Sequence, residues 1–173
     1  TYCITENQHN NYNINFIPNQ QQTKYTKDLF ESRRYIFEEG FYKPLEDNIK
    51  KIIKQYLDTS KALKMLDVGC GEGFYSRGLS ESINNLDIYA MDNAKDSIIL
   101  GAKKEQKIKW FIGDLSNIPL KSNSMDLLLN IFTPSNYSEF TRILKSDGYL
   151  IKVVPGANYL KELRECAANQ LRS

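Results

Sequence analysis

The feature that most limits the fold of this chain is a glycine-rich turn that directly follows a short apolar run. Residues 63–68 read LKMLDV and residues 69–73 read GCGEG, before a helix-length segment begins at Phe74. An apolar run of this length predicts a buried strand. Glycines after it let the backbone turn sharply and pass close to a ligand, because no β-carbon stands in the way. The sequence therefore predicts a strand–turn–helix unit with a ligand site at the turn.

The same alternation of apolar runs and helix-length segments continues along the chain after Ser60. Continuous apolar strands separated by helices are typical of a parallel sheet covered on both faces, and right-handed crossovers make such a sheet doubly wound. We therefore predict an α/β fold with a doubly wound, Rossmann-like sheet. The expected strands are Leu63–Val68, Leu86–Met91, Ile108–Ile112, Met125–Ile131 and Tyr149–Val154, and the expected helices are Phe74–Ile83, Ala94–Lys103 and Tyr137–Leu144.

The first 60 residues have a different texture. Residues 1–25 are rich in Asn and Gln and poor in periodic apolar positions, which predicts a loop or partial disorder, with one short strand at Tyr12–Pro18. One helix is expected from Thr26 to Gly40, and a second, amphipathic helix from Pro44 onward. We therefore expect an N-terminal module and linker at residues 1–25 and one larger domain at residues 26–173.

Composition places few limits on function. A formal net charge of +2 permits an RNA partner without indicating one. The three cysteines are too few and too scattered for a disulfide framework, which favours a reducing cytoplasm. No apolar run approaches the roughly 20 residues that cross a bilayer, and the N-terminus lacks a secretory pattern. We expect a cytoplasmic protein with no membrane partner.

Two acidic residues narrow the choice of ligand. Asp92 ends the second expected strand, where a carboxylate can accept hydrogen bonds from both hydroxyls of a ribose. The glycine spacing is G-x-G-x-G, whereas dinucleotide sites use G-x-G-x-x-G. Asp114 follows the third expected strand and is either a second ligand contact or an ordinary loop residue.

The sequence DVGCGEG, followed later in the chain by Asp92 and Asp114, resembles motif I of class I methyltransferases. In that class the loop holds the methionine and ribose portions of S-adenosylmethionine, and the later acidic residue takes the amino group of the adenine. The cofactor contacts that this resemblance implies are Asp67, Gly69, Gly71, Glu72, Gly73, Asp92, Asp114 and Leu115.

Four segments also resemble the RlmA-type 23S rRNA guanine-N1 methyltransferases. They are residues 33–45 (RRYIFEEGFYKPL), 65–75 (MLDVGCGEGFY), 130–134 (NIFTP) and 155–163 (PGANYLKEL). The resemblance implies transfer of a methyl group from S-adenosylmethionine to N1 of a guanine in 23S rRNA. It adds Tyr42 as a cofactor contact. It also suggests Tyr159, which stands where many relatives carry a His.

The same family implies an N-terminal zinc module. Only Cys3 and His9 stand near that end of the sequence, whereas a structural zinc site normally has four ligands. The two residues are therefore either a remnant of the module or ordinary residues. The chain lacks an initiator Met, and the last two strands of the usual sheet are expected to lie beyond Ser173. A homodimer is left open.

The catalytic residues are not determined. Guanine N1 carries a proton at neutral pH, so a base should help to remove it, and the candidates are Asp114 and Glu72. Asn130 either contacts the target base or simply ends a strand. Aromatic candidates for stacking on that base are Phe41, Phe132 and Tyr137, and basic residues that face either phosphate or solvent are Arg33, Arg34, Lys50, Lys51 and Lys54.

Two other functions fit the same residues. A methyltransferase acting on a metabolite or a quinone would carry the same glycine loop, Asp92 and Asp114. A binding module that kept the fold and lost turnover would carry them as well.

Overall fold

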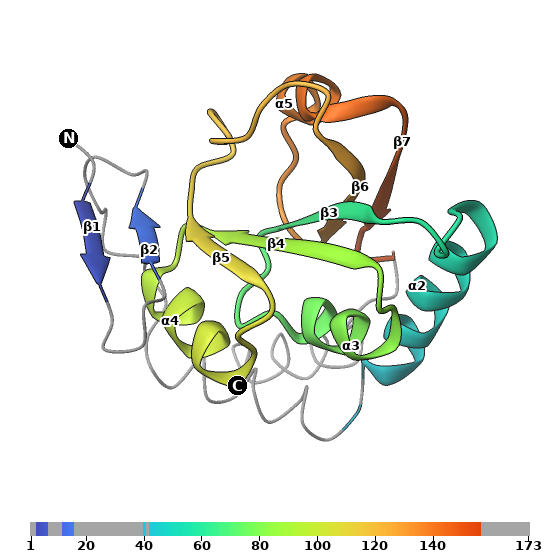
Figure 1. The fold of residues 1–173 in the computed structure, drawn as a ribbon, viewed down its shortest axis with the longest axis horizontal. Coiled ribbons are helices and arrows are strands. Elements are labelled where there is room, and N and C mark those ends of the chain that lie inside the picture. The colour runs from blue at the N-terminus through green and yellow to red at the C-terminus, as the bar shows by residue number, and fades with distance from the viewer. Residues whose placement is uncertain (1–2, 7–11, 16–39, 41, 157–173) are drawn as a thin grey trace, which may run out of the picture.

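The structure, a computed structural model, describes residues 3–6, 12–15, 40 and 42–156 of the 173 residues. Figure 1 shows these parts as a central sheet with helices packed on both sides. The strands are β1 (Cys3–Glu6), β2 (Tyr12–Asn15), β3 (Leu63–Val68), β4 (Leu86–Asp92), β5 (Lys109–Ile112), β6 (Met125–Ile131) and β7 (Leu144–Val153). The helices are α2 (Lys43–Tyr56), α3 (Phe74–Ser82), α4 (Lys95–Lys104) and α5 (Tyr137–Ile143).

The sheet has the order β1-β2-β5-β4-β3-β6-β7. The strands from β2 to β7 in this order pair in parallel, and β1 pairs antiparallel to β2. From β3 the chain moves outward through β4 to β5, then crosses back to β6 on the other side of β3. In such sheets a ligand binds at the carboxyl ends of the strands where the order reverses. The predicted doubly wound fold is confirmed, and the reversal places that point between β3 and β6.

Two apolar cores lie on opposite faces of the sheet. On one face, Ile53 of α2, Leu79 of α3 and Ile98 of α4 pack over Met65 of β3. The other face is covered by α5, and its core includes Leu66, Phe140 and Ile143. Figure 1 shows α2, α3 and α4 together on one side of the sheet and α5 on the other. The neighbours Met65 and Leu66 belong to different cores because successive side chains of a strand point to opposite faces.

The predicted strands and helices of residues 44–156 are confirmed, with differences at their ends. The largest difference is in β7, which begins at Leu144 and not at Tyr149. Leu144 pairs with Met125, and the register then shifts so that Leu127 pairs with Tyr149. The four intervening residues, KSDG, stand against the single residue Asp126, so the pairing is irregular at this point. Because these residues are not apolar, the apolar pattern predicted too late a start for the strand.

The expectation of a loop or partial disorder at the N-terminus is wrong for residues 3–6, which form β1. The strand predicted at Tyr12–Pro18 is present as β2, Tyr12–Asn15. β2 pairs with β5 through Asn15 and Ile112. Without β2, one side of β5 would carry unpaired backbone groups, and this need for a partner arises from the assembled sheet and not from the composition of the paired segment. The helix expected from Thr26 to Gly40 lies outside the described residues, apart from Gly40.

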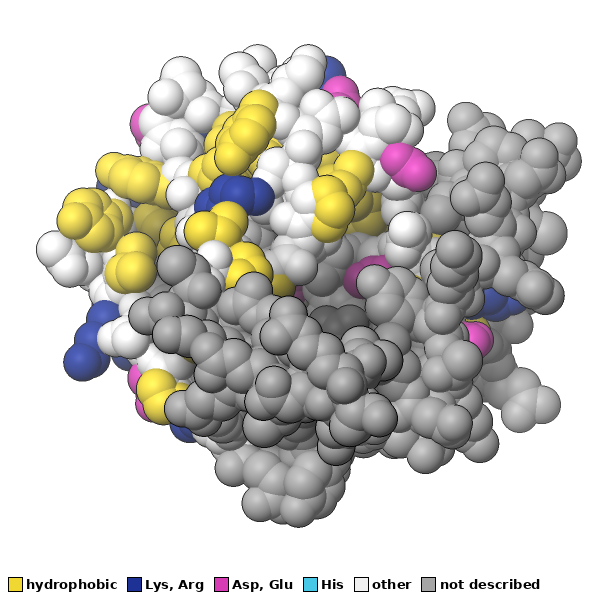
Figure 2. Space-filling view, turned by 180° about the vertical axis from the view of Figure 1, so that it is seen from behind, with side chains coloured by type: hydrophobic (Ala, Val, Ile, Leu, Met, Phe, Trp, Pro, Cys, Tyr) yellow, Lys and Arg dark blue, Asp and Glu magenta, His cyan; other side chains and the backbone are white. Residues whose placement is uncertain are grey.

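A few large apolar side chains remain at the surface. Figure 2 shows apolar side chains at several places on the described surface, with lysines or arginines near them. The rings of Tyr56 and Tyr149 lie 6.2 Å apart, so the end of α2 meets β7 at the surface. None of the helices within the described ranges has both the length and the apolar character needed to cross a membrane. The exposed large apolar residues among those described are Ile52, Tyr56, Tyr137, Tyr149 and Val154.

Candidate functional site

The glycine loop folds back over the carboxyl end of β4. The backbone N–H groups of Gly69 and Cys70 donate to the Met91 carbonyl at 2.8 and 3.0 Å. Gly69, Gly71 and Gly73 have φ angles of 72°, 57° and 71°, a region that favours glycine. The loop therefore takes a backbone path that the glycine spacing permits, and it lies at the point where the sheet order reverses.

Asp92 holds this loop in place. One of its carboxylate oxygens accepts from the Gly71 N–H at 2.7 Å, and the other accepts from the Ala94 N–H at 2.8 Å. A carboxylate can accept about four hydrogen bonds. Asp92 can therefore fix the loop and still accept from the hydroxyl groups of a ligand.

Asp67 lies beneath the loop and is 2% exposed. Its carboxyl group accepts from the Ser76 hydroxyl of α3 at 2.6 Å. Burial raises the pKa of Asp67 to about 7, the negative charge of Asp92 acts in the same direction, and the Ser76 hydrogen bond opposes both. Asp67 thus ties the end of β3 to the first turns of α3. It also keeps its proton at pH values well above those at which an ordinary aspartate ionises.

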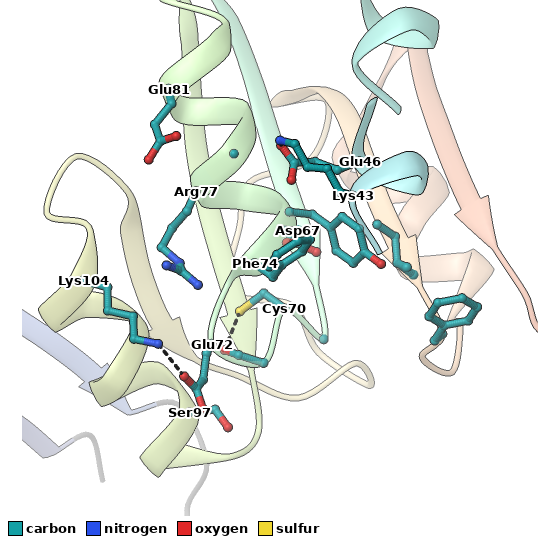
Figure 3. Close-up of a pocket in the computed structure, with 16 residues that line it drawn as sticks. Lys43, Glu46, Asp67, Cys70, Glu72, Phe74, Arg77, Glu81, Ser97 and Lys104 are labelled. Carbon is teal, nitrogen blue, oxygen red and sulfur yellow. Dashed lines mark hydrogen bonds and ion pairs between the residues drawn. The ribbon is translucent and has the colours of Figure 1, made fainter. Parts of the chain in front are cut away.

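A cavity of about 350 Å³ opens beside the loop (Figure 3). Gly69, Gly71 and Glu72 line one part of it, and residues of α2 and α3 line another. Small-molecule sites commonly have volumes of about 300–1,000 Å³. Charged groups of both signs face this cavity, namely Lys43, Arg77 and Lys104 as cations and Glu46, Asp67, Glu72 and Glu81 as carboxyl groups.

Glu46 is a functional candidate that the sequence reasoning missed. It is 3% exposed and pairs with Lys43 at 2.9 Å and with Lys50. Burial alone would raise the pKa of Glu46, but the hydrogen bonds from Lys50 and Lys43 outweigh it and hold the pKa below its ordinary value. The signal was present in the sequence, because lysines three residues before and four residues after a glutamate share its helix face.

The loop after β6 lies directly against the glycine loop. A β-carbon at Gly69 would lie 2.8 Å from the Thr133 Cβ and 2.9 Å from its Cγ2. Phe132 has a φ of 54°, which is uncommon for a residue other than glycine. Its ring lines the cavity, and the ring centroid lies 6.0 Å from that of Tyr42. The structure therefore brings Tyr42 and Phe132 together beside the glycine loop.

Asn130 is fully buried at the end of β6 and is held in a polar network. Its side-chain oxygen accepts from Lys152 of β7 and from Ser135, each at 2.7 Å, and its amide donates to the Pro134 carbonyl at 2.9 Å. Lys152 also donates to Ser135. Asn130 thus organises the loop that follows its own strand, which favours a positioning role over direct contact with a base.

Asp114 and Leu115 are not among the residues that line the cavity, whereas Glu72 is. Asp114 is exposed, and its carboxylate accepts from the Ser116 N–H at 2.7 Å. This bond and a second one from the Ser116 side chain lower the pKa of Asp114. Leu115 packs against the core on the α5 face. Glu72 pairs with Lys104 at 3.0 Å.

Several predicted residues are not described in full. The residues that lie outside the described ranges are His9, Arg33, Arg34, Phe41 and Tyr159, and of Cys3 only its place in β1 is described. Among the side chains that the structure describes, no three His, Cys, Asp or Glu residues are grouped so that they could hold a metal ion. The predicted zinc site therefore stays a prediction.

The residues present fit S-adenosylmethionine. A β-carbon at Gly71 would meet nothing within 4 Å, so the backbone there is open to a ligand. Next to it, Asp92 offers free acceptor positions for ribose hydroxyls. The adjoining cavity carries both cations and carboxyl groups, which match the charges at the amino-acid end of this cofactor.

The sheet order, the glycine loop and Asp92 together define a class I methyltransferase domain. The profile of the methyltransferase domain family matches residues 66–152, half of the chain, and the chain belongs to that family. A crystal structure from Methanococcus maripaludis, provisionally assigned as an S-adenosyl-L-methionine-dependent methyltransferase, matches with a TM-score of 0.67 and 25% identity. The match covers 89% of this chain and 74% of that chain.

Two curated relatives bear out the resemblance to rRNA guanine-N1 methyltransferases. A protein of Bacillus subtilis (strain 168), provisionally named 23S rRNA (guanine-N(1)-)-methyltransferase YxjB, is 40% identical over 156 residues, which are 88% of this chain and 55% of that protein. The 23S rRNA (guanine(748)-N(1))-methyltransferase of Streptomyces fradiae is 24% identical, over 80% of this chain and 50% of that protein. The chain thus spans about half the length of these relatives.

Proposed function

We propose that this chain is the cofactor-binding part of a methyltransferase that transfers a methyl group from S-adenosylmethionine to N1 of a guanine in 23S rRNA. The observation that carries the cofactor assignment is the hydrogen bond from Gly71, in the loop after β3, to Asp92 at the carboxyl end of the neighbouring strand β4. The relatives from Bacillus subtilis and Streptomyces fradiae support the choice of substrate.

The cofactor would lie along the carboxyl ends of β3, β4 and β5. Asp92 would accept from its ribose hydroxyls, and Asp114 with Leu115 would contact the adenine. The amino-acid end would enter the cavity, where Asp67, Gly69 and Glu72 form part of the wall. Tyr42 would close the site through its contact with Phe132. Gly73 would contribute through the shape of the loop, and Tyr159 stays a predicted contact.

The target guanine would lie beside the loop that follows β6. This loop touches Gly69 through Thr133 and carries the ring of Phe132 at the cavity wall, so a base there would be near the cofactor. A guanine that is paired through N1 must first leave its stack, and an aromatic ring can then support it. Methyl transfer of this kind depends chiefly on alignment and on the exclusion of water.

The proton on guanine N1 needs an acceptor. The Ser116 bonds stabilise the ionised form of Asp114 and make it a weaker base, and Glu72 is paired with Lys104. Of the two candidates, Glu72 is the one that lines the cavity. We therefore propose Glu72 as the first residue to test for this role, by the pH dependence of methyl transfer in Glu72→Gln.

The cofactor assignment is tested by calorimetric titration of the chain with S-adenosylmethionine. Asp92→Ala should bind at least about tenfold more weakly, because hydrogen bonds to a charged group contribute about 1.5–3 kcal/mol each. Asp58→Ala, which removes an exposed carboxylate that does not line the cavity, is the matched control and should bind like the unaltered chain. Equal affinities of all three proteins would refute the proposed role of Asp92.

The substrate assignment is tested by methyl transfer to unmodified 23S rRNA, with the modified position read by mass spectrometry. Methylation of N1 of a guanine supports the proposal. Methylation of a quinone or metabolite in place of RNA would favour the small-molecule alternative. Cofactor binding without any transfer would favour a binding module.

Three finer expectations accompany this proposal. A zinc ion at Cys3 and His9 would appear in metal analysis of the purified protein and would be lost in Cys3→Ser. A homodimer would appear in sedimentation at micromolar concentration. A cytoplasmic location follows from the substrate, because ribosomal RNA is found there.

A further inference from the structure

Arg77 lines the cavity, and its guanidinium group forms no ion pair with a carboxylate in the part of the chain that the structure describes. Its backbone N–H donates to the Gly73 carbonyl at 2.9 Å, so it lies one turn into α3 from the glycine loop. Its Nε atom is buried and has no hydrogen-bond partner among the described residues. An unsatisfied buried polar group costs about 1–3 kcal/mol, and more when it is charged. A group of this kind at a cavity wall calls for an acceptor from a ligand.

The other two cations of the cavity differ from Arg77. Lys43 pairs with Glu46 at 2.9 Å, and Lys104 pairs with Glu72 at 3.0 Å. Figure 3 shows these two pairs on opposite sides of the view, with Arg77 extending from α3 between them. Among the three cavity cations, Arg77 is therefore the one whose charge no described carboxylate neutralises.

We propose that Arg77 binds the carboxylate at the amino-acid end of S-adenosylmethionine, an inference that rests on the proposed function. A guanidinium group matches a carboxylate because it can donate two parallel hydrogen bonds. The ammonium group at the same end of the cofactor finds carboxyl oxygens in the same cavity, which Asp67 also lines. The cavity thus offers a partner for each charge of a zwitterion.

The test uses two ligands that differ only in this carboxylate, S-adenosylmethionine and its decarboxylated form. Each is titrated calorimetrically into the unaltered chain and into Arg77→Met. The variant should bind S-adenosylmethionine about tenfold to a hundredfold more weakly, because a charge-assisted hydrogen bond is lost. Its affinity for the decarboxylated ligand should be unchanged. Lys61→Met, which removes a cation whose side chain is 76% exposed, should change neither affinity.

Arg77→Lys provides a second measurement on a more conservative variant. It keeps the charge and loses the paired donors, so its preference for the carboxylated ligand should fall between those of the other two proteins. Equal weakening of both ligands in the variants, or no weakening at all, would overturn the role of Arg77 and leave the proposed function standing. Failure of the unaltered chain to bind either ligand would overturn both.

Discussion

Replacing Gly69 by alanine should destabilise this domain more than the same replacement at Gly71. Both residues have a positive φ, 72° and 57°, so each substitution places an L-residue in a conformation that costs about 1–2 kcal/mol. Their surroundings differ. At Gly71 a β-carbon meets nothing within 4 Å, whereas at Gly69 it lies 2.8 and 2.9 Å from two carbons of Thr133.

Carbon atoms prefer separations of about 3.5–4.0 Å, so the loops at Gly69 and Thr133 would have to move apart. Overpacking of this kind adds about 1–3 kcal/mol. We therefore expect Gly69→Ala to lower the free energy of unfolding by about 2–5 kcal/mol and Gly71→Ala by about 1–2 kcal/mol. Urea denaturation measures both, provided that the slope with denaturant is unchanged.

A double variant isolates the contact itself. Thr133→Gly removes the atoms that the new β-carbon would strike, so Gly69→Ala should be less harmful in the Thr133→Gly background. The coupling energy should be about 1–3 kcal/mol. If Gly69→Ala destabilises no more than Gly71→Ala, or if Thr133→Gly gives no relief, the two loops do not meet as described.

Three further outcomes are expected. Because burial raises the pKa of Asp67 to about 7, stability should fall by up to about 4 kcal/mol as the pH rises from about 4 to about 7. Asp67→Asn should remove that fall when denaturation curves at pH 4.5 and 7.5 are compared. Asn136, which accepts from the Glu139 N–H and donates to the Leu115 carbonyl, caps α5, so Asn136→Ala should lower the stability by about 0.5–2 kcal/mol in urea denaturation. Ile53 is fully buried, so Ile53→Ala should lower the free energy of unfolding by about 2–5 kcal/mol. Ile52→Ala, at a position 40% exposed, should lower it much less in the same assay.

Much of the candidate site could be predicted because its signals are local. Asp92 and Gly71 are 21 residues apart, yet the end of one strand and the loop of its neighbour must meet at the same edge of a parallel sheet. The glycine spacing and the acid after the second strand therefore indicated one shared ligand site, and the hydrogen bond between Gly71 and Asp92 was added by the structure. Arg77 carried no such signal, because an arginine on a surface helix is ordinary and only its lack of a described partner makes it notable.

The sequence by itself determined the succession of strands and helices in residues 44–156 and the place of the glycine loop. These features follow from the periods of apolar residues and from the conformations open to glycine, which act over a few residues. The tertiary structure alone decided that β1 and β2 extend the sheet, that Lys152 reaches Asn130 across 22 residues, and that burial raises the pKa of Asp67. Each of these depends on which distant groups share an edge or an interior, and the pattern of a single segment carries no record of its partners.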